Sequence, residues 1–178
     1  MNKLFKNNAY LVLELFINNP NTDFHIRKVA RMLKLTHPTV SRHISKLSKL
    51  GFLKKKDDSI YPTYHADVES DQYKLYKRNY IVEKIIDSGL VEYIQKKTLA
   101  SSIILFGSCA KGTYTQKSDI DIFVEAEDNK LDISKFEKSL GRSINLLYES
   151  RIKDLSTELQ NNIINGIVLY GFIRMGGK

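Results

Sequence analysis

Apolar residues recur at helical spacing through the first fifty positions, and they predict three helices. The first helix is expected over residues 8–18, Asp23 is expected to cap the second, and Gly51 ends the third. The expected buried positions of the second and third helices are Ile26, Val29, Ala30, Leu33, Val40, Ile44, Leu47 and Leu50. Two short strands at residues 52–53 and 60–64, joined by a charged turn, are predicted next.

The pattern then changes to connecting helices and to strands that are apolar along their length. The further elements expected are connecting helices over 67–99, strands over 103–106, 118–124 and 143–148, a helix over 131–140, and a helix with a short extended segment over 155–171. The sequence therefore predicts an α+β protein with three parts. These are a helical domain at 1–66, connecting helices at 67–99 and a mixed-sheet domain at 100–178 flanked by helices.

Composition narrows the class of protein. The chain has 178 residues, of which 42% are hydrophobic and 27% charged, as in ordinary soluble proteins. No run of about 18 apolar residues predicts a membrane span, and the N-terminus does not resemble a secretory signal. The single cysteine, Cys109, excludes an intramolecular disulfide and a cysteine-based zinc site. A cytoplasmic protein without a membrane partner is expected.

The net charge of +8 is confined to one part of the chain. Residues 1–66 contain 12 Lys and Arg against 4 Asp and Glu, whereas residues 67–178 contain 16 of each. A basic surface of this size favours a polyanion such as DNA as the partner. A solvated lysine-rich surface is the alternative on charge alone.

The third helix leaves a short polar and basic surface exposed, and a basic hairpin follows it. The segment TVSRHISKLSKLGFL resembles the winged helix-turn-helix of small bacterial and archaeal transcription regulators. The resemblance implies contacts with double-stranded DNA from the third helix and from the hairpin. The residues so implied are Thr39, Ser41, Arg42, Ser45, Lys46, Lys54, Lys55 and Lys56. A winged helix used for protein contact or dimerisation is the alternative.

Gly107 and Ser108 directly follow the apolar strand at 103–106. Glycine allows close approach of a ligand, and serine offers a hydroxyl and an N–H to a phosphate oxygen. Lys111 adds a positive charge within the next turn. A P-loop is disfavoured, because Thr113 and Tyr114 stand where that motif requires Lys and Ser or Thr.

Asp119 and Asp121 lie two residues apart on the next strand, so both side chains are expected on one face. Neighbouring carboxylates repel one another unless a cation lies between them, and oxygen ligands suit Mg²⁺ or Mn²⁺. The alternative is that both aspartates face solvent on an edge strand. The preceding Gly107-Ser108 favours the metal interpretation.

The combined pattern GSCAKGTYTQKSDIDIF resembles the minimal nucleotidyltransferases of the DNA polymerase β superfamily, over about residues 88–172. The resemblance implies that a nucleoside triphosphate, expected to be ATP, binds with Mg²⁺ and that its nucleotidyl group is transferred to a hydroxyl. It implies that Gly107 and Ser108 contact the β and γ phosphates, and that Asp119 and Asp121 are catalytic and hold the metals.

Active members of that family carry a third carboxylate on a later strand. Asn145 occupies that place here, and an amide brings no negative charge and accepts no proton from the attacking hydroxyl. Glu149, four residues later, is a candidate substitute. Nucleotide binding is therefore expected to be retained, with transfer weakened or lost.

Two functions from different classes follow from these features. The first is a DNA-binding transcription regulator whose second domain binds a Mg-nucleotide. The second is an active Mg²⁺-dependent nucleotidyltransferase acting on a protein or nucleic-acid hydroxyl, with the winged helix as a targeting module. A third possibility is a pair of interaction scaffolds without a nucleotide. A homodimer is compatible with the first function, because winged helices often bind two half-sites.

Overall fold

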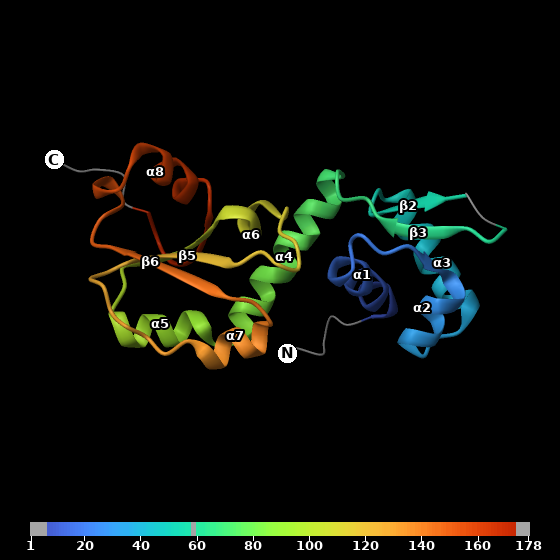
Figure 1. The fold of residues 1–178 in the computed structure, drawn as a ribbon, viewed down its shortest axis with the longest axis horizontal. Helices are drawn as coiled ribbons and strands as arrows, with labels where there is room; N and C mark the ends of the chain where they lie inside the picture. Colours follow the sequence, from blue (N-terminus) through green and yellow to red (C-terminus); the bar gives the residue numbers. More distant parts are fainter. Residues whose placement is uncertain (1–6, 58–59, 174–178) are drawn as a thin grey trace. The chain divides into compact units, whose positions relative to one another are not determined.

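The computed structural model describes residues 7–57 and 60–173 and divides into two compact units (Figure 1). The first unit extends to Lys77 and the second begins at Arg78, so that α4 (Asp71–Asp87) contributes residues to both. Among the described residues, no helix has the length and apolar character needed to cross a membrane.

The first unit contains three helices and a small antiparallel sheet. Its elements before α4 are α1 (Asn8–Asn18), β1 (Phe24–His25), α2 (Ile26–Leu33), α3 (His37–Lys49), β2 (Leu53–Lys56) and β3 (Thr63–Ala66). The strand order is β1-β3-β2, with Leu53 opposite Ala66 and Phe24 opposite Tyr64. Most of the predicted stripe positions form its core, and Val29, Val40 and Ile44 are fully buried. The expected burial of Leu50 is wrong, because Leu50 is the C-cap residue after α3 and is 51% exposed.

The expected capping role of Asp23 is wrong. Strand β1 intervenes between Asp23 and α2, which begins at Ile26 after an N-cap His25 without a side-chain cap bond. The Asp23 carboxylate instead lies 3.4 Å from the Lys56 amine and 3.3 Å from Nδ1 of His65. The pairing of β1 with β3 fixes residues 24 and 25 as extended backbone, so the helix starts later than its sequence suggests.

The second unit is a four-stranded mixed sheet with helices on both faces, as expected for the α+β class. Its elements after α4 are α5 (Leu90–Thr98), β4 (Ser102–Phe106), α6 (Gly107–Lys111), β5 (Ile120–Glu125), α7 (Ser134–Leu140), β6 (Ile144–Glu149), a 3-10 turn (Ile152–Asp154), α8 (Thr157–Ile164) and β7 (Ile167–Gly171). The strand order is β6-β5-β4-β7. Only the β5–β6 pair is parallel among these neighbours.

Alternate residues of β4 and β5 belong to different apolar clusters on the two faces of this sheet. Ile103 and Leu105 pack with α5 and α7, whereas Ile104 packs with Phe123 and with Ile163 of α8. In Figure 1, α5 and α7 lie on one side of the strands and α8 lies on the other. Both faces of the central strands are therefore covered, which explains the continuous apolar run at 103–106.

Candidate functional site

Three strands bring the predicted site residues to one end of the sheet. β4 is antiparallel to β5 and pairs Phe106 with Asp121, so the residue after Phe106 lies beside the start of β5. β6 is parallel to β5 and pairs Asp121 with Asn145. Paired residues on adjacent strands project to the same face. The register therefore places Gly107, Asp121 and Asn145 together although up to 38 positions separate them along the chain.

Gly107 is the residue for which this arrangement requires glycine. Its φ of +70° lies in the left-handed region, which side chains with a Cβ adopt at a cost. A Cβ at this position would lie 2.5 Å from Oδ2 of Asp121. The backbone of the loop is therefore packed directly against the carboxylate of Asp121. Ser108 follows as a half-buried residue of α6, in the turn that leaves this loop.

Cys109 and Lys111 differ in how they relate to the site. Cys109 is fully buried, and its thiol donates to the backbone carbonyl of Asp119 at 3.4 Å. It thereby packs α6 against the segment that carries the first aspartate, as a structural residue. Lys111 is exposed at the last position of α6, where its charge is open to solvent.

The side chain of Asn145 contacts both aspartates. Its Nδ2 donates to Oδ1 of Asp121 at 3.0 Å and to Oδ2 of Asp119 at 3.4 Å. These contacts show that the two carboxylates share a face, as the period of two predicts. The amide N–H groups thereby partly compensate the two negative charges. The third position of the expected acidic set is therefore a donor to the other two.

Arg142 is a part of the site that the sequence did not predict. Its Nη1 donates to the carbonyl oxygens of Thr115 at 2.5 Å and Ser118 at 2.8 Å. Its guanidinium lies 4.8 Å from the centroid of the buried Tyr114 ring. Arg142 thus stabilises the loop that precedes Asp119 through hydrogen bonds to two of its carbonyl groups. It follows a turn 24 residues later in the chain, so no local motif connects it to this loop.

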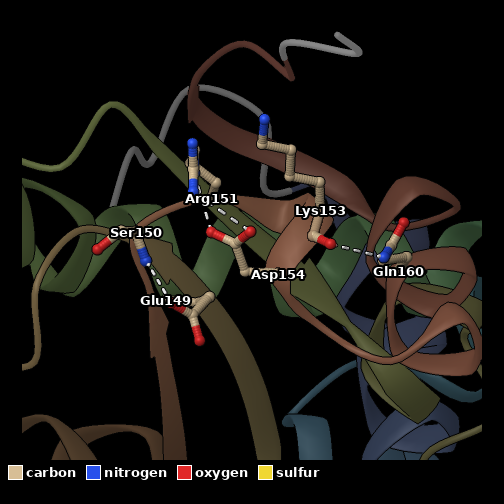
Figure 2. A network of polar contacts seen from close by, with 6 residues as sticks. All are labelled: Glu149, Ser150, Arg151, Lys153, Asp154 and Gln160. Carbon is tan, nitrogen blue, oxygen red and sulfur yellow. Dashed lines mark hydrogen bonds and ion pairs between the residues drawn. The ribbon is translucent and has the colours of Figure 1, made fainter.

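Glu149 does not replace the missing acid. The register pairs it with Glu125, four residues along both strands from the Asp121–Asn145 pair. At about 3.3 Å per residue, this separation is roughly 13 Å. Its Oε1 accepts from the backbone N–H of Ser150 at 2.9 Å, as Figure 2 shows. Arg151 and Asp154 form an ion pair in the segment that follows, at 2.9 Å.

The donor set fits one divalent cation. Asp119 and Asp121 supply carboxylate oxygens, and Asn145 can supply an amide oxygen if its side chain rotates. Mg²⁺ is commonly held by one or two carboxylates together with substrate phosphates. Within residues 7–57 and 60–173, no group of three or more His, Cys, Asp and Glu side chains could hold a metal.

The residues implied for DNA contact differ in exposure. Arg42, Ser45 and Lys46 are exposed on α3, whereas Thr39 and Ser41 are half-buried. The Thr39 hydroxyl lies 2.8 Å from that of Thr36. Burial, followed by the charges of Arg42 and Lys46, lowers the pKa of His43. The charges of Arg42 and Lys46 therefore lie close enough to His43 to disfavour its protonation.

The lysines of β2 are exposed but paired with acids. Lys54 lies 2.9 Å from Asp67, and Lys55 lies 2.8 Å from Asp57. Lys56 pairs with Asp23 at 3.4 Å. Each pair compensates a positive charge that the sequence assigned to a polyanion. The hairpin is therefore less electropositive than its three consecutive lysines indicate.

Comparison with known proteins identifies the second unit. The family described as Polymerase beta, Nucleotidyltransferase matches residues 88–172, the range expected from the motif. A putative protein adenylyltransferase of Methanocaldococcus jannaschii is 37% identical over 67 residues, which cover 67% of that protein and 33% of this chain. A crystal structure of a toxin-antitoxin with AMP-PNP has 28% identity and a TM-score of 0.38. It covers 51% of this chain and 73% of that chain. Through residues 88–172, the chain belongs to the polymerase β nucleotidyltransferase family.

Proposed function

We propose that this chain is a Mg²⁺-dependent nucleotidyltransferase, with ATP as the preferred donor. It joins the α-phosphate of the donor to a hydroxyl of a protein, breaks the bond between the α- and β-phosphates, and releases pyrophosphate. The observation that carries the proposal is the contact between the Gly107 backbone and the Asp121 carboxylate, with Asp119 on the same face. The family supports the reaction class. The relative named as a putative protein adenylyltransferase supports a protein acceptor.

The residues of this chain have separate roles in the proposed reaction. Gly107 lets the triphosphate approach the backbone, and Ser108 donates its hydroxyl to a phosphate oxygen. Asp119 and Asp121 hold Mg²⁺ or Mn²⁺, which neutralises charge on the phosphates when it is bound. Arg142 keeps the loop before Asp119 in place through its two carbonyl contacts. Lys111 is an exposed cation that attracts the triphosphate.

Asn145 is expected to make this transferase slow. A carboxylate in that position accepts the proton of the attacking hydroxyl, and the Asn145 amide cannot. General base catalysis contributes about 10²–10⁴-fold to a rate. The proposed enzyme therefore retains phosphate positioning and charge neutralisation but lacks this contribution. Its acceptor hydroxyl must lose its proton to water or to a group on the partner protein.

The second candidate function is a DNA-binding regulator in which the nucleotide is a signal. Asn145 favours it, because a site that binds Mg-nucleotide without turnover suits a sensor. The exposed Arg42, Ser45 and Lys46 on α3 and the basic residues 1–66 support a winged helix that binds double-stranded DNA. In the first function, the same domain directs the transferase to its target.

Transfer of label from ATP tests the proposal. The full chain is incubated with Mg²⁺ and ATP labelled on the α-phosphate, together with proteins from a lysate. We expect label on a protein, and its loss when Asp119→Ala and Asp121→Ala are combined. Glu149→Gln is the matched control, because it also removes an acid but lies at the far end of β6.

The label-transfer assay, combined with calorimetry, separates the two functions. The regulator is supported if Mg-ATP binds in calorimetry but neither the wild type nor the Asn145→Asp variant transfers label to a protein. Salt-dependent binding of duplex DNA that Arg42→Ala weakens is then expected. If only the Asn145→Asp variant transfers label, the third carboxylate is the one group that the wild-type site lacks for transfer.

A further inference from the structure

The first unit contains a cavity that the proposed function does not use. It has a volume of ≈ 790 Å³ and lies between α2 and the residues that lead into β3. This volume is within the range of about 300–1,000 Å³ typical of small-molecule sites. Its polar and aromatic lining includes His25, Arg27, Lys28, Arg31, His37 and Tyr61. None of these residues belongs to the predicted α3 and β2 contact set.

The charge of the cavity has one sign. Arg27, Lys28 and Arg31 line it, and no acidic residue among 7–57 and 60–173 does. Arg27 and Arg31 are four positions apart on α2, an arrangement in which like charges destabilise a helix. Within the same described ranges, neither arginine forms an ion pair. The nearest acid before α2 is Asp23, which pairs with Lys56 and His65.

An anion in the cavity would remove this repulsion. Arg and Lys side chains on one helix can donate several charge-assisted hydrogen bonds to a phosphate group. The lysines of β2 differ, because each already has a carboxylate within 3.4 Å. Among the described residues, the cations of α2 therefore lack the acidic partners that the hairpin lysines have.

The aromatic part of the lining adds a flat surface. Tyr61 is 63% exposed, and the Arg27 guanidinium carbon lies 5.6 Å from its ring centroid. Nδ1 of His25 lies 3.3 Å from the carbonyl of Pro62, which links the start of α2 to the segment that carries Tyr61. The cations of α2 beside the exposed ring of Tyr61 suit a ligand that has an anionic group and a planar ring.

We propose that this cavity binds one nucleotide, with its phosphate against Arg27, Lys28 and Arg31 and its base on Tyr61. Inorganic phosphate would fill little of ≈ 790 Å³ and would leave Tyr61 unused. The nucleotide can be free or can be one unit of a nucleic-acid strand, since both present the same phosphate and base. The site is separate from the family's nucleotide site around Gly107, and it needs no metal.

Fluorescence anisotropy of the full chain in EDTA tests this proposal. The probes are labelled ATP, a labelled single-stranded oligonucleotide and a labelled duplex, each bound to the Asp119→Ala/Asp121→Ala variant so that the metal-dependent site is silent. We expect Arg27→Ala and Arg31→Ala each to weaken binding at least tenfold. Lys49→Ala, which removes an exposed cation of α3 outside the cavity, is the matched control.

Tyr61 distinguishes a nucleotide from a bare anion. Base stacking on an aromatic ring contributes about 1–3 kcal/mol, or roughly 5- to 150-fold in affinity. Tyr61→Ala is therefore expected to weaken binding of all base-containing probes, whereas Tyr61→Phe retains it. Competition by free ATP identifies a free nucleotide, and competition by oligonucleotide alone identifies a strand. Arg27→Ala behaving like Lys49→Ala, or no probe binding in EDTA, would overturn the proposal, whatever the outcome of the label-transfer assay.

Discussion

Replacing Asn145 with aspartate tests the arrangement of the site most directly. In the wild type, its Nδ2 donates to Asp121 at 3.0 Å and to Asp119 at 3.4 Å. The variant exchanges these two donors for a third negative charge at the same place. Two unit charges about 4 Å apart repel by about 1 kcal/mol in water, which applies because Asn145 and Asp119 are exposed. Two such pairs lower the free energy of unfolding by about 2 kcal/mol without metal.

This destabilisation should appear as a lower melting temperature that Mg²⁺ reverses. For a unit of about 100 residues, a loss of 2 kcal/mol lowers the Tm by roughly 8–16 °C. A ligand present at a hundredfold excess over its Kd stabilises by about 2.7 kcal/mol, so saturating Mg²⁺ offsets the loss. The wild type, with two carboxylates and an amide, is expected to gain less from the same Mg²⁺ concentration.

Differential scanning calorimetry of the wild type, Asn145→Asp and Asn145→Ala, each in EDTA and in MgCl₂, measures these effects. Asn145→Ala is the control, because it removes the donor without adding charge and should lower the Tm less than Asn145→Asp. Equal Tm values for the two variants in EDTA would refute the placement of Asn145 between the aspartates. In the label-transfer assay, Asn145→Asp is expected to raise the rate by about 10² or more.

Three further predictions concern other parts of the chain. Gly107→Ala should abolish Mg-ATP binding in calorimetry, because its Cβ would meet Asp121; Gly141→Ala shares the positive φ but has open space, so it should retain binding. Arg142→Ala should weaken Mg-ATP binding and increase proteolysis within the loop before Asp119, and unchanged cleavage would contradict its fastening role. The lowered pKa of His43 means that the unfolded chain binds its proton first, so His43→Gln should reduce the loss of stability as the pH falls below about 6.5.

Much of the fold and of the candidate site follows from local sequence. Helical spacing predicted α1 over residues 8–18 and the burial of Val40, Ile44 and Leu47 in α3, because an amphipathic period needs no knowledge of the partner surface. The Gly107-Ser108 and Asp119-Asp121 pairs were also predicted from local sequence. Each depends on a turn or on the alternation within one strand. The strand that carries Asn145 was also expected, from its apolar residues after a turn.

Other features depend on strand pairing between distant segments. The capping role of Asp23 was wrong, because β3 pairs with residues 24 and 25 and extends them. Only the parallel register of β5 and β6 shows that Glu149 lies too far away to replace the third carboxylate, since the sequence alone leaves its position along the sheet open. A register decides which residues face one another, and it is set by packing of the whole sheet.

The sequence by itself predicted the helices, the central strands, the glycine and serine after β4, and the two aspartates, because each is encoded by spacing within a single element. The tertiary structure decided what surrounds them. It placed the Asn145 amide against both carboxylates, brought Arg142 to the loop before Asp119, and formed the basic cavity beside Tyr61. These contacts join side chains from separate elements, and only the packing of those elements sets their distances.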